Sequence, residues 1–548
     1  MITREARAGR FPGPSLIPEL HAIQRKHGWL PPKSLAELSR VTQRPLYEIQ
    51  GLISFYPHFR TKLPEAAIEI GVCRDLACWL QPDFTTTESI TKRYAQNDDI
   101  SVCSVSCLGR CDIAPAAVVN GQPIPLKNLD LTINAVRDDS LEETSALQPN
   151  RKWPTDPYTE RNKTLAYALS RAALKEDLDI QFIIEELKAS NLRGMGGAGF
   201  PTGLKWEIVK GEPATPKYVI CNADESEPGT FKDRQILAEL PHLVLEGMLL
   251  GMLAIGAQKG WVFIRHEYGP EEHIIREEIA RMEAIGLLGE NAFGTNKSLK
   301  IDVFTSPGGY ILGEETALIE CMEGHRGEPR NKPPFPGEKG LWGQPTLINS
   351  VETFAAIPSI LTHGSGWWRD QGIGKSDGLK FFAVSGHIQN PGVYCVPLGT
   401  PLNELLELAG GIANGADLGA VQPGGASSNF VGSEQVEVPL NFEALADAGS
   451  MLGSGAIVAM DINTDLLAAA TNVLGFFRQE SCGKCVPCRV GSKKAEVILT
   501  DLLANGGTVE DVDIRIPELE ETMRLTSICG LGQVALGPVM SVIELAKK

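Results

Sequence analysis

Four cysteines near the C-terminal end of the sequence have the spacing of an iron–sulfur ligand set. Cys482, Cys485 and Cys488 lie in the run E-S-C-G-K-C-V-P-C-R, and Cys529 follows in S-I-C-G-L-G. Three thiolates spaced C-x2-C-x2-C can bind three corners of one cubane, and a distant cysteine can bind the fourth. Zinc sites usually combine two CxxC pairs or include histidine, and no histidine lies near this run. The pattern therefore predicts a [4Fe–4S] cluster rather than a zinc site. A disulfide is not expected either, because a reducing compartment would not maintain it.

A second set of cysteines, Cys73, Cys78, Cys107 and Cys111, falls into two pairs. Two pairs at strand-to-loop junctions could bind the two irons of a [2Fe–2S] cluster from opposite sides. Spacing alone leaves two alternatives open, because zinc also accepts four thiolates and Cys103 could replace one ligand. The predicted cubane elsewhere in the chain favours iron–sulfur chemistry here too, and hence transfer of single electrons.

A glycine-rich run, R-G-M-G-G-A-G-F-P-T-G-L-K-W, occupies residues 193–206. Clustered glycines let backbone N–H groups approach a phosphate, and the N-terminus of a following helix favours the same negative charge. The run lacks the Gly-Lys-Ser/Thr ending of a Walker motif and the spacing of the Rossmann fingerprint. Because glycine-rich loops are common, the run alone does not establish a phosphate site.

Acidic residues gather in two segments, 221–229 and 308–316, each of which follows an apolar run and glycines. Such pairs are usually solvated helix ends. In an α/β fold, however, the loops after the strands are where ligands bind. A carboxylate there could accept hydrogen bonds from ribose hydroxyls and repel a 2′-phosphate, which would favour NAD(H) over NADP(H).

The length of 548 residues predicts three to five domains. A net charge of −17 argues against nucleic acids and anionic membranes as partners. We expect a cytoplasmic protein, because the first residues lack an apolar signal segment and the most apolar stretch, 243–257, contains Glu246 and is too short to span a bilayer. The cysteines outside the two sets, Cys103, Cys221, Cys321 and Cys395, are expected to be buried structural thiols.

The hydrophobic pattern predicts the order of the elements. Three helices are expected at 16–23, 34–42 and 46–55, followed by short strands from residue 67. Alternation of helices, a glycine loop and strands, including a buried strand at 218–220 and a helix over 231–257 broken near Pro241, predicts an α/β sheet up to about residue 370. A strand–turn–strand–helix pattern at 378–412, with Thr400 as the helix N-cap, predicts a β-grasp-like domain, and the rest is expected to be helical.

Five longer motifs extend over roughly 165–548: L-R-G-M-G-G-A-G-F-P-T-G-L-K-W, C-N-A-D-E-S-E-P-G-T-F-K-D-R, G-E-E-T-A-L-I-E, G-x-R-G-E-P-R-x-K-P-P-F-P and E-S-C-G-K-C-x-P-C-R. Together they closely resemble the NADH-binding flavoprotein subunit of respiratory complex I and its soluble relatives. Residues 10–135, with C-L-G-R-C, resemble the thioredoxin-like [2Fe–2S] subunit of the same family.

The resemblance implies a multidomain α/β fold. Its parts would be an N-terminal helical subdomain (1–60), a thioredoxin-like [2Fe–2S] domain (61–137), a linker (138–164), a Rossmann-like FMN/NADH domain (165–372), a β-grasp SLBB domain (373–464) and a helical [4Fe–4S] domain (465–548).

The resemblance also implies the cofactors and their residues. Both cysteine sets match the family's cluster ligands, and Phe200, Glu227, Glu315 and Phe335 match positions around the nicotinamide nucleotide. Met195, His266 and Ser350 depart from the usual arginine, glycine and asparagine of the family. FMN would contact Gly194, Gly196, Gly197, Gly199, Lys205, Asn222, Asp224, Glu225, Tyr310, Gly313, Glu314 and Asn349.

These cofactors imply a converter between two-electron and one-electron chemistry, in which hydride passes between NAD(H) and FMN and single electrons pass to the clusters. Fusion of both modules in one chain resembles the diaphorase subunits of soluble NAD-linked formate dehydrogenases and NAD-reducing hydrogenases. Hydrogenase-type fusions tend to lack first-module cluster ligands, whereas all four are present here. The resemblance thus favours a molybdenum or tungsten formate dehydrogenase catalytic subunit as the partner in a hetero-oligomer.

Two related alternatives remain, a hydrogenase diaphorase and a fused complex I module. An electron-transfer scaffold without a nucleotide site is a third alternative, and the glycine and acidic loops argue against it.

Overall fold

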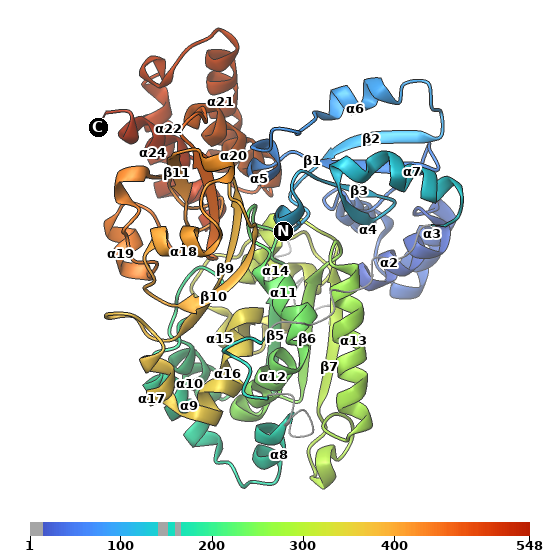
Figure 1. Ribbon diagram of the computed structural model, residues 1–548. Helices are drawn as coiled ribbons and strands as arrows, with labels where there is room; N and C mark the ends of the chain where they lie inside the picture. Colours follow the sequence, from blue (N-terminus) through green and yellow to red (C-terminus); the bar gives the residue numbers. More distant parts are fainter. Residues whose placement is uncertain (1–14, 141–151, 159–165, 548) are drawn as a thin grey trace.

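The computed structural model describes residues 15–140, 152–158 and 166–547 (Figure 1). At its centre lies a four-stranded parallel sheet in the order β7-β6-β5-β8. The strands are apolar and largely buried, as expected for a parallel sheet covered on both faces. The predicted strand at 218–220 is confirmed as part of β5. The bounds are β5 Tyr218–Ala223, β6 Lys259–Arg265, β7 Lys300–Ser306 and β8 Thr346–Ser350.

The helix predicted over 231–257 is confirmed as two helices that meet at Pro241. They are α11 (Lys232–Glu239) and α12 (Pro241–Ile255), bent by 93° relative to each other. Within the described residues no single helix is long and apolar enough to cross a membrane, and this bent pair alone reaches that length and composition together. The remaining helices around the sheet are α8 Ala168–Leu174, α9 Ile180–Ala189, α10 Thr202–Gly211, α13 Gly269–Ala284, α14 Glu315–Met322, α15 Pro336–Lys339, α16 Val351–His363 and α17 Ser365–Asp370.

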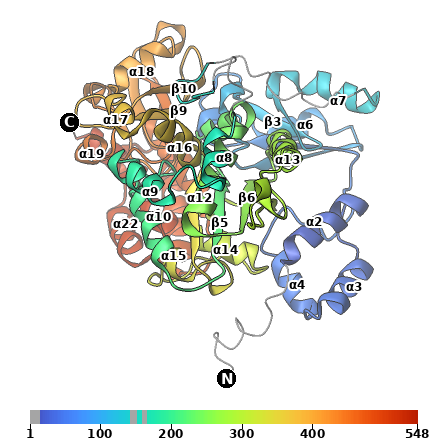
Figure 2. The ribbon, with the colours of Figure 1, turned by 90° about the horizontal axis from the view of Figure 1, so that it is seen from below.

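The three predicted N-terminal helices are confirmed as α2 (Leu16–His27), α3 (Pro32–Thr42) and α4 (Leu46–Ile53). They form a separate lobe beside the sheet (Figure 2). A second, four-stranded sheet follows in the order β2-β1-β3-β4, with β1 parallel to β2 and antiparallel to β3. Its elements are β1 Ile68–Cys73, α5 Leu76–Trp79, α6 Thr87–Arg93, β2 Ile100–Val105, β3 Ala116–Val119, β4 Gln122–Pro125 and α7 Leu129–Arg137.

The predicted strand–turn–strand–helix unit is present as β9, β10 and α18, within a five-stranded sheet ordered β10-β9-β13-β11-β12. The N-cap prediction for Thr400 is wrong. Helix α18 begins after Pro401, and the Thr400 hydroxyl donates instead to the carbonyl of Pro397 at 2.7 Å, because that acceptor lies at the end of β10. The bounds are β9 Leu379–Gly386, β10 Gly392–Pro397, α18 Leu402–Leu408, β11 Leu418–Gln422, β12 Val431–Gly432, α19 Phe442–Asp447 and β13 Ala456–Asp461.

The C-terminal part is helical, as predicted, and packs beside the five-stranded sheet (Figure 1). Helices α20 and α21 form its longest pair, and the [4Fe–4S] motif lies in the turn between them. The bounds are α20 Leu466–Glu480, α21 Val486–Ala504, α22 Arg515–Thr526, α23 Gly530–Val534 and α24 Gly537–Leu545.

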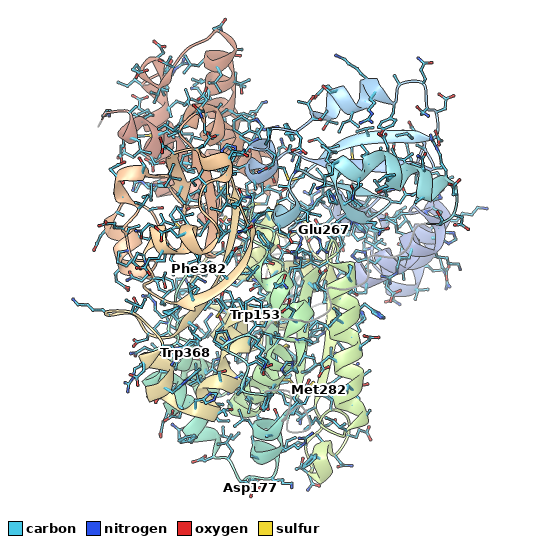
Figure 3. The ribbon with its side chains drawn as sticks, in the orientation of Figure 1. Trp153, Asp177, Glu267, Met282, Trp368 and Phe382 are labelled. Carbon is cyan, nitrogen blue, oxygen red and sulfur yellow. The ribbon has the colours of Figure 1, made fainter. Side chains whose placement is uncertain are left out.

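Residues 141–151 and 159–164 of the predicted linker lie outside the described residues. Residues 152–158 pack on the core. The ring of Trp153 lies 5.1 Å from that of Phe381 on β9, and Figure 3 shows Trp153 between the five-stranded sheet and the parallel sheet. The Tyr158 hydroxyl donates to the buried Glu246 at 2.7 Å, and burial raises the pKa of Glu246 to about 7. Paired with a hydroxyl and the Ser170 N–H, this carboxyl is accommodated inside a helix that is otherwise apolar.

Candidate cofactor and nucleotide site

The loops that follow β5, β7 and β8 meet at the carboxyl edge of the parallel sheet. Although β6 separates β7 from β5, the Asn222 side chain donates to the carbonyl of Gly313 at 2.9 Å, so the loop after β7 folds back over the end of β5. On the other side, Asn349 at the end of β8 lies opposite Cys221 of β5. The two acidic segments and Asn349 therefore come together, at the edge where parallel α/β sheets bind ligands.

The glycine-rich run forms a tight loop between α9 and α10. The N–H of Gly194 donates to the carbonyl of Phe200 at 2.9 Å and closes the loop. Gly197 and Gly199 have φ values of +128° and +63°, which favour glycine. The loop leads directly into α10, so backbone N–H groups of the loop and the N-terminus of this helix can together form a cradle for a phosphate group.

Lys205 and Asn349 are held in place behind this loop. Lys205 Nζ donates to the carbonyl of Ile348 at 3.0 Å, and burial lowers the pKa of Lys205. Asn349 Oδ1 accepts from the indole N–H of the fully buried Trp206 at 3.0 Å, which leaves the amide N–H₂ of Asn349 as the donor. Hydrogen bonds between α10 and the end of β8 thus fix the positions of both side chains.

Asp224 supplies a buried acceptor without a partner. Its Oδ1 accepts from the Ser306 hydroxyl at 3.3 Å, whereas Oδ2 has no hydrogen-bond partner among the described residues. Burial raises the pKa of Asp224 to about 7, although Arg265 opposes the shift. A buried, unsatisfied carboxylate oxygen needs a donor from a ligand, and a flavin carries N–H and O–H groups that fit.

The carboxylate of Glu225, unlike that of Asp224, has hydrogen-bond partners on both oxygens. Its two carboxylate oxygens accept from the N–H groups of Asp233 and Arg234, at 2.6 and 2.8 Å, in the first turn of α11. The Tyr268 hydroxyl donates a third hydrogen bond at 2.9 Å. Three hydrogen bonds thus engage the Glu225 carboxylate at the start of α11, so its side chain has less capacity left for a flavin than that of Asp224.

Glu314 likewise accepts from the N–H groups of Thr316 and Ala317 at the start of α14. Lys332 Nζ lies 2.9 Å from a carboxylate oxygen of both Glu314 and Glu315. The positive charge of Lys332 therefore partly neutralises the acidic pair. The sequence analysis did not predict this ion pair, although Lys332 lies in one of the quoted motifs.

Two of the residues predicted around the nucleotide present exposed aromatic rings. Phe200 and Phe335 expose 43% and 58% of their surface, which is unusual for aromatic side chains and leaves two rings free to stack on a ligand. Tyr310 packs edge-on against Phe476 of α20, with 5.0 Å between the ring centroids. Its N–H donates to Glu480 at 2.8 Å, so the loop after β7 is joined to the helix that precedes the [4Fe–4S] motif.

The family departures Met195 and Ser350 form one hydrogen-bonded unit behind the loop. The Met195 N–H donates to the hydroxyl of Thr353 at 2.9 Å, and the Ser350 hydroxyl lies 2.8 Å from the same oxygen. His266 lies away from the glycine loop, where its ring centroid is 4.1 Å from that of His58 in the N-terminal lobe.

Cys73, Cys78, Cys107 and Cys111 converge in the interior. All four are buried, and the Sγ atoms of Cys107 and Cys111 are 3.6 Å apart. Hydrogen bonds among the thiols and burial raise the pKa of Cys73 and Cys111, while the same bonds lower that of Cys107. Buried thiols packed this closely suit a metal cluster.

Cys103 lies apart from this set. It is exposed on β2, opposite Gly71 of β1. The expectation that Cys103 is a buried thiol is therefore wrong, and Cys395 is only half-buried, whereas Cys221 and Cys321 are buried as predicted.

The loop that carries Cys107 and Cys111 is docked on the parallel-sheet domain by buried arginines. Arg265 donates to the carbonyl of Cys107 at 2.6 Å, and Arg234 donates to that of Gly109 at 3.0 Å. Arg265 is paired with Glu267 at 2.8 Å, and Figure 3 places Glu267 at this junction. The [2Fe–2S] module is thus packed into the same core as the flavin loops rather than being a loosely appended domain.

The C-terminal cysteines also form one cluster-binding site. Cys482 and Cys485 lie in the turn between α20 and α21, Cys488 lies in α21, and Cys529 precedes α23. Burial raises the pKa of Cys529 to about 12, with Cys482 adding to the shift, and that of Cys488 to about 11, with Cys485 adding. None of the twelve cysteines, all within the described residues, forms a disulfide.

Comparison with known proteins agrees with this architecture. Four families match separate parts of the chain: a thioredoxin-like [2Fe–2S] ferredoxin at 8–133, the Nuo51 FMN-binding domain at 187–359, an SLBB domain at 381–428 and the NADH-ubiquinone oxidoreductase-F iron–sulfur binding region at 468–547.

Individual proteins are also similar to this chain over most of its length. An NADH-quinone oxidoreductase subunit of Escherichia coli is 40% identical over 395 residues, which cover 71% of this chain and 87% of the relative. The NADP-reducing hydrogenase subunit HndC of Solidesulfovibrio fructosivorans is 44% identical over 363 residues, covering 66% and 74%. The crystal structure of an NAD+-reducing [NiFe]-hydrogenase in the air-oxidized state superposes with a TM-score of 0.83 at 32% identity, over 97% of this chain and 92% of that one.

The fold and sites define an NAD(H)-dependent flavin and iron–sulfur oxidoreductase subunit of the diaphorase type. The chain belongs to the family of NADH-quinone oxidoreductase subunits that contain the Nuo51 FMN-binding domain, and it carries FMN, one [4Fe–4S] cluster and one [2Fe–2S] cluster. The relatives are subunits of hydrogenases and of NADH-quinone oxidoreductases.

Proposed function

We propose that this chain is the diaphorase subunit of an NAD-linked formate dehydrogenase and reduces NAD+ with electrons from a molybdenum- or tungsten-containing catalytic subunit. The supporting observation is the intact first module, in which Cys73, Cys78, Cys107 and Cys111 are all present, buried and convergent. A complete cluster site argues for a fusion in which the [2Fe–2S] cluster takes part in electron transfer.

In this proposal the chain's own residues bind and orient the reactants. The glycine loop (Gly194, Gly196, Gly197 and Gly199) holds the FMN phosphate, Phe200 and Phe335 stack on the rings of the nucleotide, and Glu227 and Glu315 accept hydrogen bonds from its ribose. The bound flavin supplies exchange of two electrons on one side and of one electron on the other. No side chain is needed as a general acid or base.

The partner is proposed to dock beside the [4Fe–4S] ligands. Val486 and Val490, one turn apart at the start of α21, expose 58% and 52% of their surface directly after Cys485. Three of the cluster's four cysteines are only half-buried. A cluster near the surface beside exposed apolar side chains is suited to electron exchange across a subunit interface.

A hydrogenase partner is the second candidate, and the match to the NAD+-reducing [NiFe]-hydrogenase structure over 97% of this chain favours it. The native complex, purified anaerobically through a tag on this chain, separates the two. We expect formate-dependent and not hydrogen-dependent NAD+ reduction, with molybdenum or tungsten and no nickel in the complex. Hydrogen-dependent reduction with nickel present would transfer the assignment to a hydrogenase.

A further inference from the structure

We propose that Ser427 of the SLBB domain is a positioning residue for the nicotinamide nucleotide, because it orients the Glu227 carboxylate at the mouth of the flavin site. The inference rests on the proposed contact between Glu227 and the nucleotide. It extends the binding site from the parallel-sheet domain to the five-stranded sheet 200 residues further along the chain.

The contact between the two side chains is specific. Glu227 Oε1 accepts from the Ser427 N–H at 2.9 Å and also from the Ser427 hydroxyl. Oε2 has no hydrogen-bond partner within the described part of the chain. One oxygen is thus held by two donors from the SLBB domain, and the other remains available to accept a hydroxyl from a ligand.

The backbone two residues before Ser427 lies close against the Glu227 carboxylate. Gly425 has a φ of +88°, and a Cβ at that position would lie 2.8 Å from the Glu227 carboxyl carbon. A side chain there would displace the carboxylate, so glycine is required for the close approach.

The charge of Glu227 depends on the same contact. Burial raises the pKa of Glu227, and both hydrogen bonds from Ser427 oppose the increase. Burial also raises the pKa of Tyr310, with the charge of Glu227 adding to the shift and a hydrogen bond with Ser427 opposing it, so the phenol stays protonated and Ser427 contacts both side chains. Ser427 therefore stabilises the ionised form, which is the form that accepts ribose hydroxyls and repels an added phosphate.

Other contacts between the same two domains provide a matched control. The hydroxyls of Thr230 and Ser454 are 2.7 Å apart and buried. The Thr230 N–H donates to the main-chain carbonyl of Glu227 at 3.0 Å, but neither hydroxyl is hydrogen-bonded to the Glu227 carboxylate. Ser454→Ala removes an interdomain hydrogen bond of similar kind while leaving the Ser427 contact in place. A general weakening of the domain interface can thus be distinguished from a specific effect on Glu227.

The test is calorimetric binding of NAD+ and NADP+ to the full chain carrying its cofactors, together with steady-state reduction of an artificial acceptor by NADH. For Ser427→Ala we expect NAD+ to bind about 5- to 10-fold more weakly, the size of effect typical of one lost hydrogen bond, with KM for NADH rising and kcat unchanged. NADP+ affinity should fall less, because the carboxylate can rotate away from the phosphate. Ser427→Thr, which keeps the hydroxyl, should restore NAD+ binding, and Ser454→Ala should leave it unchanged.

Equal weakening in Ser427→Ala and Ser454→Ala, or an unchanged NAD+ affinity in Ser427→Ala, would overturn the proposal. Glu227→Gln separates this failure from that of the proposed function. If Glu227→Gln weakens NAD+ binding and Ser427→Ala does not, Glu227 contacts the nucleotide without help from Ser427. If neither variant changes binding, Glu227 is not a nucleotide contact and the positioning role falls with it, while formate-dependent turnover tests the partner assignment independently.

Discussion

Lys380 is the residue whose removal should disturb the flavin site most from a distance. It is fully buried on β9, where its ammonium lies 3.2 Å from Glu352 and 3.5 Å from the carbonyl of Met195 in the glycine loop. Lys232 lies 2.7 Å from the same Glu352 oxygen and 2.7 Å from Asp233. Two cations and two carboxylates thus form a neutral buried network that joins the SLBB domain to the glycine loop.

Lys380→Met would leave this network with one uncompensated negative charge. Removing one partner of a buried ion pair typically destabilises a protein by about 3–5 kcal/mol. For a domain of 150–250 residues this corresponds to a melting temperature lower by roughly 10 °C. Burial alone would raise the pKa of Glu352, whereas Lys232 and Lys380 lower it. Without Lys380 the carboxyl can take up a proton more easily, so the loss of stability should be smaller at pH 5.5 than at pH 8.

The assay is thermal release of flavin, followed by its fluorescence, in the full chain. Lys375→Met, at an exposed position five residues earlier, is the matched control. The double variant Lys380→Met/Glu352→Gln removes the charge and its partner together, so its loss should be clearly less than the sum of the single losses. A Lys380→Met protein that releases flavin at the same temperature as Lys375→Met would refute the role of the network.

Three further predictions follow from other parts of the structure. Lys332→Met should increase the preference for NADH over NADPH about fivefold in dye reduction, because an unneutralised Glu315 would repel the 2′-phosphate by about 1 kcal/mol more. Gly109→Ala should abolish the [2Fe–2S] EPR signal and retain the [4Fe–4S] signal, because the new Cβ would lie 2.2 Å from the Tyr268 hydroxyl beneath the cluster loop. Burial lowers the pKa of His21 to about 4, with His266 adding to the shift. The stability that His21 provides is therefore present above pH 6.5 and is lost as the pH falls towards 4, by at most about 3 kcal/mol. His21→Leu should reduce the extra hydrogen exchange of α2 at pH 5, after correction for intrinsic rates, and the remainder comes from His58 and His266, whose pKa values burial also lowers.

Each of these has a control in the chain. Lys339→Met is the control for Lys332→Met, and His27→Gln is the control for His21→Leu, because both change exposed residues nearby in the chain. Gly121→Ala is the control for Gly109→Ala, because it places a Cβ in open space at a similar positive φ. An unchanged nucleotide preference in Lys332→Met would remove the ion pair from the specificity argument. A normal [2Fe–2S] signal in Gly109→Ala would mean that the loop can shift without losing its cluster. Exchange in α2 that rises equally at pH 5 in His21→Leu would place the acid sensitivity elsewhere.

Most of the element order was predictable because the signals are local. Proline and glycine mark the ends of the helices, and the alternation of apolar strands with loops predicted the parallel sheet. The C-x2-C-x2-C spacing predicted three thiols of the [4Fe–4S] set, since such a run brings thiols together within one turn. For Cys73, Cys78, Cys107 and Cys111 the spacing alone left zinc and Cys103 as alternatives, and the resemblance supplied the ligand set. The fold class was confirmed by the family matches.

What the sequence did not predict depends on contacts between distant segments. Ser427 lies 200 residues after Glu227, and nothing in its neighbourhood distinguishes it from other serines. Arg234 and Arg265 were not recognised as anchors of the cysteine loop, because no sequence pattern identifies the acceptor of an arginine that lies in a helix or at the end of a strand. The Thr400 prediction was wrong because a serine or threonine before a helix can donate to a nearby carbonyl instead of capping.

The central claim is that one chain accepts electrons from NADH and divides them between two clusters. The direct measurement is an anaerobic titration of the purified full chain with NADH, followed by visible absorbance and low-temperature EPR. The account predicts bleaching of flavin absorbance together with a [2Fe–2S] signal and a [4Fe–4S] signal, at least one of them appearing with NADH alone and both present after dithionite. Flavin that NADH cannot reduce, or a dithionite-reduced chain that shows only one type of cluster, would contradict it.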